Sequence, residues 1–154
     1  MVDRFTSKAI ELPPADHPIE RADLIFYGLD HSGDSYEGQV FLDTRGAGRD
    51  ADSEHRAYVG SFFILGHGGC FGDIGHCDIP TDDRDRFDLR PAHQLEPAIR
   101  ILTVTDAVRS LVERGREQAV VTVVARASGR SNEVLAFDTV RLASYAPSVT
   151  PASD

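Results

Sequence analysis

The chain has 154 residues, of which 41% are hydrophobic, and this is an ordinary globular composition for one domain. Its net charge of −9 disfavours binding to nucleic-acid backbones and to anionic membrane surfaces. No apolar run is long enough for a transmembrane helix, and the polar N-terminus lacks the apolar core of a signal peptide. We therefore expect a cytoplasmic protein with reduced cysteines and with neither a nucleic-acid nor a membrane partner.

Apolar segments with a period of two predict a series of strands. Residues 1–20 precede them and are rich in proline, which predicts an irregular, flexible arm. The expected strands are 21–30, 36–43, 57–65, 98–105, 118–126 and 134–145. Between the third and the fourth, residues 66–97 contain too much glycine, proline and charge for regular structure.

One helix is expected at 106–115, with Thr105 as its N-cap and Gly115 ending it in a left-handed conformation. Because strands otherwise follow strands, the sequence predicts a mostly β fold, an antiparallel β-sandwich (or barrel-like) domain of about six to seven strands. The last two strands are expected to pair as an antiparallel hairpin. A single domain over 21–145 would then end in a frayed tail at 146–154.

Four potential metal ligands lie within eleven residues of the glycine-rich segment 66–80, GHGGCFGDIGHCDIP. They are His67, Cys70, His76 and Cys77. Imidazole and thiolate are the ligands that zinc and copper(I) prefer, and two of each complete a tetrahedral shell. The spacing H-x2-C-x5-H-C is not that of a standard zinc finger, so the pattern leaves copper and zinc both open.

His31 lies in the turn after the first predicted strand, LDHSGDSYEG, and we expect it to face the same end of the sandwich as His67. There it would serve as a fifth ligand or as a partner that orients a ligand. A surface histidine in a turn is the simpler alternative. Carboxylates also flank the Cys/His segment, where they either raise the local cation concentration or are simply solvated. These are Asp73, Asp78, Asp82, Asp83 and Asp85.

Two other interpretations of the Cys/His segment stay open. Cys70 and Cys77 would close a disulfide loop worth only about 2–3 kcal/mol if the protein met an oxidising environment. The segment would otherwise be a glycine-rich turn with incidental thiols. Catalytic motifs give no competing answer, because the sequence contains no G-x-S-x-G elbow, no P-loop and no H-E-x-x-H.

Four strings of the sequence resemble the C-terminal β-sandwich region of tyrosinase-family proteins. They are LIFYGLDHSGDSYEGQVFLD, AYVGSFFILGHGGCFGDIGHCDIP, FDLRPAHQLEP and ILTVTDAVRSL. That region follows the copper domain in plant polyphenol oxidases and related bacterial copper proteins. The resemblance covers roughly 21–145, includes Gly60, Ser61, Phe62 and His67, and is consistent with a bacterial origin. The catalytic domain of the family holds two coppers with six histidines on a four-helix core, which this chain does not provide.

The resemblance therefore implies an accessory domain without the oxidase activity. Such a domain would bind copper or zinc through the Cys/His segment and would partner, shield or metal-load a tyrosinase-like copper protein. A second hypothesis is a metal-free interaction module, binding another protein or itself, with the Cys70/Cys77 loop as a structural staple. A third is a small metalloenzyme with an open metal position beside His31 or Asp73, although no positioned general base is visible.

Overall fold

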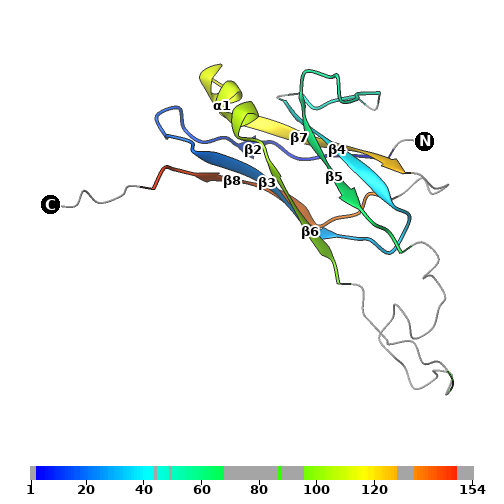
Figure 1. Cartoon of the computed structure of the whole chain (residues 1–154). Helices are drawn as coiled ribbons and strands as arrows, with labels where there is room; N and C mark the ends of the chain where they lie inside the picture. Colours follow the sequence, from blue (N-terminus) through cyan, green and yellow to red (C-terminus); the bar gives the residue numbers. More distant parts are fainter. Residues whose placement is uncertain are drawn as a thin grey trace.

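Alternating apolar residues place most of the chain in strands. In a computed structural model the described residues are 3–43, 45–48, 50–67, 87, 96–127 and 134–148. The strands among them are β1 (Asp3–Thr6), β2 (Ile10–Glu11), β3 (Arg21–Leu29), β4 (Tyr36–Asp43), β5 (Tyr58–Ile64), β6 (Ala98–Thr103), β7 (Gln118–Ala127) and β8 (Thr139–Tyr145). One helix, α1 (Thr105–Glu113), lies at one end of the strands (Figure 1). The prediction of a mostly β fold with one short helix is confirmed.

The strands form two antiparallel sheets. The larger has the order β1-β7-β4-β5, with β2 also paired to β7, and the smaller has the order β6-β3-β8. Figure 1 shows the two sheets as layers, with β3 and β8 in one and β4, β5 and β7 in the other. This two-layer arrangement is sandwich-like, as the sequence predicts.

The core fills the space between the layers. From β3, Leu24 and Phe26 are fully buried, whereas the alternate residues Ile25 and Tyr27 are only partly buried. The larger sheet contributes Val40 from β4 and further valines from β7. Alternation over residues 24–27 therefore gives this part of β3 one core-facing side and one outward side.

The expectation of an irregular arm over residues 1–20 is wrong for β1 and β2. Both strands pair with β7, with Asp3 opposite Ala125 and Ile10 opposite Ala119. Phe5 packs against Phe137 at 4.5 Å between ring centroids, so this short strand adds a partly buried aromatic side chain to the core as well as pairing its backbone. β1 has one apolar residue among its four, so the sequence contains too little alternation to predict this strand.

The predicted hairpin between the last two strands is also wrong, because β7 and β8 belong to different sheets. Residues 134–138 cross from one layer to the other, and β8 begins only at Thr139. The Asp138 backbone N–H donates to the Tyr27 carbonyl at 2.9 Å, which leads the chain onto β3. Val140 and Leu142 then bury the inner side of β8 against the core.

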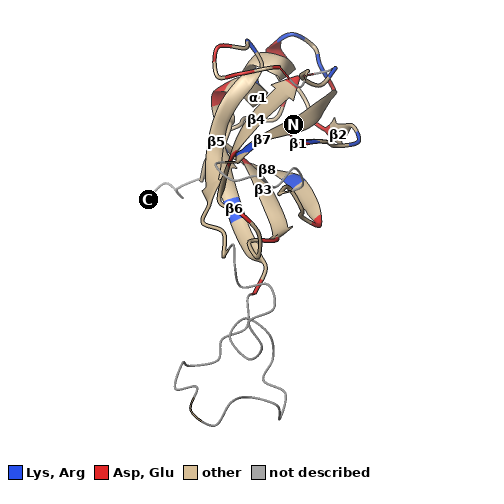
Figure 2. Cartoon of the chain, turned by 90° about the vertical axis from the view of Figure 1, so that its right-hand side faces the viewer, with Lys and Arg blue, Asp and Glu red and all other residues tan. Residues whose placement is uncertain are grey.

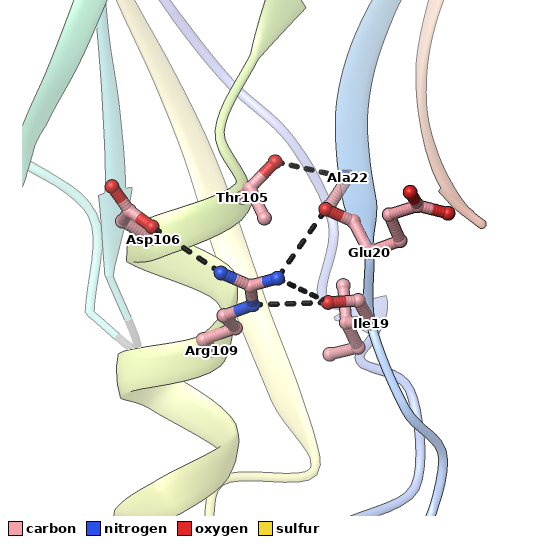
Figure 3. A network of polar contacts seen from close by, with 6 residues as sticks. All are labelled: Ile19, Glu20, Ala22, Thr105, Asp106 and Arg109. Atoms are coloured by element: carbon pink, nitrogen blue, oxygen red, sulfur yellow. Dashed lines mark hydrogen bonds and ion pairs between the residues drawn. The ribbon is translucent and has the colours of Figure 1, made fainter. Parts of the chain in front are cut away.

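Helix α1 forms where it was predicted, but Thr105 does not cap it. The Thr105 hydroxyl instead accepts a hydrogen bond from the Ala22 backbone N–H at 3.1 Å, so it joins the helix to β3 (Figure 3). Gly115 ends the helix with φ +69°, as predicted. Its N–H donates to the Val112 carbonyl, and the Arg116 N–H donates to the Leu111 carbonyl, which is the Schellman arrangement. No helix among the described residues is long and apolar enough to cross a membrane.

Arg109 fixes the outer side of α1 to the segment before β3 (Figure 3). Its Nε donates to the Ile19 carbonyl at 3.0 Å, and Nη2 donates to the Glu20 carbonyl at 3.3 Å. Nη1 lies 3.7 Å from the Asp106 carboxylate. A nine-residue helix is too short to persist alone, so these contacts and its buried face hold it in place.

A glycine in β4 is required by the packing of the core. Gly38 lies opposite Phe62 in the β4–β5 register, and a Cβ at position 38 would lie 2.5 Å from the Phe62 ring. We expect Gly38→Ala to lower the free energy of unfolding by about 1–3 kcal/mol, because the ring must leave its position. Urea unfolding measures this loss. Gly48→Ala is the control, since a Cβ there meets no atom within 4 Å; equal losses in both variants would contradict the packing argument.

Candidate metal centre

Two chain segments meet at the end of the sheets opposite α1. The β4–β5 ladder starts with Tyr36 opposite Ile64, so the turn before β4 runs beside the residues that follow β5. The Gly66 N–H donates to the Ser35 hydroxyl at 3.0 Å, and the His67 N–H donates to the His31 carbonyl at 2.9 Å. A Cβ at position 66 would lie 2.2 Å from the Gly33 carbonyl oxygen, so only glycine allows this close approach.

The same contacts bring two predicted site residues together. His31 Nδ1 lies 3.3 Å from His67 Nδ1, and the ring centroids are 5.0 Å apart with planes inclined by 68°. Both side chains are partly buried. The expectation that His31 faces the same end of the fold as His67 is therefore correct, although they are 36 positions apart and two strands lie between them.

The His31 ring is oriented by a backbone carbonyl. His31 Nε2 lies 2.7 Å from the Glu96 carbonyl oxygen, which can only accept, so Nε2 carries a proton. In the neutral ring, Nδ1 then presents its lone pair to His67. His67 Nδ1 also lies 3.4 Å from the His31 carbonyl oxygen.

The two Nδ1 atoms lie within hydrogen-bond distance of each other, and their separation would also suit one shared ion. Two nitrogens bound at about 2.0–2.1 Å to a tetrahedral zinc are about 3.3 Å apart, and their rings have centroids about 5 Å apart. The observed 3.3 Å and 5.0 Å match both values. Among the described residues, no group of three or more His, Cys, Asp or Glu side chains gathers to hold a metal ion. The histidine pair thus provides two of the four donors that a tetrahedral metal site needs.

The other proposed ligands lie outside the described residues. These are Cys70, His76 and Cys77, and the same holds for the five flanking aspartates. Cys70 follows His67 by three residues in the sequence, and Glu96 resumes the described chain. His31 and His67 are therefore the part of the predicted site whose geometry is known.

The Glu96 carbonyl is a contributor to this site that the sequence did not reveal. It acts through its backbone oxygen, so no residue type or spacing marks it in advance. His55, by contrast, received no role from the sequence, and the structure gives it a local one. Its Nδ1 accepts the Ala57 N–H at 3.2 Å, and its ring packs against Phe41.

No known protein-family model matches the chain, and no curated protein matches its sequence. Function is therefore inferred from the residues and their contacts. The contact between His31 and His67 is the main one that supports this inference.

Tyr36 closes the core beneath the histidine pair. Its side chain is 4% exposed, and its hydroxyl has no hydrogen-bond partner within the described parts of the chain. Burial, helped by the negative charges of Asp30 and Asp3, raises the pKa of Tyr36 from 10.0 to about 12. The neutral phenol is therefore the form that the folded protein retains.

We expect the stability of the folded protein to fall as pH rises from 10 towards 12. In this window the unfolded chain releases the Tyr36 proton while the folded chain keeps it, so unfolding is favoured. Tyr36→Phe should remove this part of the fall and should be neutral or stabilising by up to about 1 kcal/mol at pH 7. Urea midpoints across pH 7–12 measure both effects. Tyr58→Phe is the control, and an identical pH profile for Tyr36→Phe and wild type would contradict the assignment.

Proposed function

We propose that the chain is a non-enzymatic metal-binding accessory domain that partners, shields or metal-loads a tyrosinase-like copper oxidase. The ligands would be His67, Cys70, His76 and Cys77, joined by His31. The observation that carries the proposal is the 3.3 Å separation of the His31 and His67 Nδ1 atoms. The sequence resemblance to the tyrosinase C-terminal region supports the choice of partner.

The chemistry of the donors supports copper(I) or zinc. Thiolates are soft ligands, and a set of two thiolates with imidazoles suits both ions, whereas magnesium and calcium prefer oxygen. A histidine that binds a metal through one nitrogen commonly donates its other N–H to a carbonyl. His31 already makes this bond to the Glu96 carbonyl at 2.7 Å. His31 would then bind the ion through Nδ1 with its ring orientation fixed in advance.

Exposed apolar side chains beside the histidine pair support a protein partner. Phe63 and Leu65, which lie just before His67, are 68% and 79% exposed. The Arg100 guanidinium donates to the Phe63 carbonyl at 3.2 Å and to the Ile99 carbonyl at 2.9 Å, so exposed Ile99 lies close to Phe63. Exposed apolar side chains that gather in one place are typical of interaction sites.

Metal analysis of protein purified without an immobilised-metal column tests the proposal. We expect about one equivalent of zinc or copper per chain, lost in Cys70→Ser/Cys77→Ser and in His67→Ala. His31→Ala should weaken metal binding by about 10–100-fold, whether it acts as a ligand or orients one. His55→Ala is the matched control and should keep the metal.

The identity of the metal separates two forms of the proposal. Copper would favour delivery to an oxidase, and a tightly held zinc would favour a structural role. Wild-type protein that binds neither metal and carries two reduced thiols would contradict metal binding altogether.

The exposed apolar residues also support the second candidate, a metal-free interaction module that includes self-association. In that case Cys70→Ser/Cys77→Ser would leave fold and association unchanged under reducing conditions. Phe63→Asp/Leu65→Asp would abolish association, because two charges would have to be desolvated in the contact. Sedimentation velocity on the protein alone measures the self-association. Association that persists in Phe63→Asp/Leu65→Asp would place the contact elsewhere.

A further inference from the structure

A cavity lies at the other end of the fold from the histidine pair, and arginines dominate its lining. It has a volume of about 410 Å³ and is lined by Arg45, Arg56, Arg114 and Arg116, with Asp43 as the one carboxylate among its described lining residues. Figure 2 shows basic segments in blue among acidic ones at the end of the molecule that carries α1. Four arginines lining one cavity contrast with a chain whose net charge is −9.

These arginines come from three separate parts of the sequence. Arg45 follows the end of β4, Arg56 precedes β5, and the other two lie at the end of α1. Gly115, with φ +69°, reverses the chain between Arg114 and Arg116. The Nε of Arg114 donates to the Ser110 carbonyl at 2.9 Å, which fixes that side chain beside the helix end. Arg114 and Arg116 alone would be explained by the negative end of the helix dipole, but Arg45 and Arg56 would not.

Among the described residues that line the cavity, arginines outnumber carboxylates by four to one. Arg56 lies 3.6 Å from Asp43, and the Arg56 side chain is 85% exposed, so this pair is weak and can exchange for a ligand. The three other guanidinium groups share the cavity with no further described carboxylate. Arginines that line one cavity carry like charges, so an anion bound among them would relieve their repulsion. Leu111, which is 5% exposed, contributes an apolar surface beside them.

We propose that this cavity binds a compact polyanion that carries two or more phosphate or carboxylate groups. The planar guanidinium fork matches both groups with paired hydrogen bonds, and several forks from different directions select a multiply charged ligand. The volume lies within the range of small-ligand sites, which is about 300–1,000 Å³. This site uses none of the residues of the proposed metal centre.

Calorimetric titration of the full chain with pyrophosphate and, separately, with citrate tests the proposal. The protein is first freed of metal on a chelating resin, and ionic strength is held constant with NaCl. We expect saturable binding of about one anion per chain. Arg45→Gln and Arg116→Gln should each weaken it roughly tenfold or more, because each removes a charged hydrogen-bond donor. Binding of pyrophosphate alone would identify a phosphate ligand, and binding of citrate alone a carboxylate ligand.

Two controls separate this site from general electrostatics and from metal chelation. Arg141→Gln removes the same charge from β8, where Arg141 lies over the Tyr27 ring at 5.8 Å, and should leave binding within about twofold of wild type. The Cys70→Ser/Cys77→Ser variant should bind the anion as wild type does, since it removes only the proposed metal ligands.

The thermal midpoint distinguishes a binding role of the arginines from a structural one. Pyrophosphate should raise the midpoint of wild type but not that of Arg45→Gln/Arg116→Gln. Without anion, the double variant should melt at or above the wild-type temperature, because it relieves repulsion. The absence of saturable binding to both anions, or an equal weakening in Arg141→Gln, would overturn the proposal.

Discussion

The packing of Phe26 against Phe62 holds the two layers of this fold in register. Phe26 comes from the middle strand of the smaller sheet and Phe62 from the edge of the larger one, and their ring centroids are 4.9 Å apart. Phe137 joins them at 5.7 Å from Phe26 and continues to Phe5 of β1. One chain of buried and partly buried rings therefore joins β3 of the smaller sheet to β5 and β1 of the larger sheet, through Phe137 in the crossover between the layers.

The histidine pair depends on this packing. His31 follows Phe26 by five residues, and His67 follows Phe62 by five. Since β3 and β5 leave the aromatic contact towards the same end of the molecule, their next turns arrive side by side. Gly38 leaves room for the Phe62 ring, and Gly66 allows the final approach of the two backbones. The separation of the two Nδ1 atoms thus depends on the packing of Phe26 against Phe62, which lie five residues before the two histidines.

The local sequence pattern predicted where most strands and the helix lie, but not which strands pair with each other. Apolar runs bounded by turn residues placed β3, β4, β5 and β7 within one or two residues, even though β4 and β7 are buried on both sides. Nothing local could show that β8 joins β3 rather than β7, since that choice is made by burial across the two layers. Thr105 likewise had the right type for a cap, yet its hydroxyl accepts a hydrogen bond from the backbone of β3. The meeting of His31 with His67 was predictable from turns at one end, whereas the arginine cavity needed three distant segments and had no sequence signal.

The pairing of β1 with β7 has a consequence for synthesis of the protein. Asp3 pairs with Ala125, 122 residues later, so β1 leaves the ribosome long before its partner exists. At about 5–20 residues per second this interval is roughly 6–24 s, and Phe5 lacks its final contacts throughout it. Contacts between such distant residues also slow folding after release. During translation the larger sheet can begin only from β4 and β5, and β7 then has to join β4 on one side and β1 and β2 on the other.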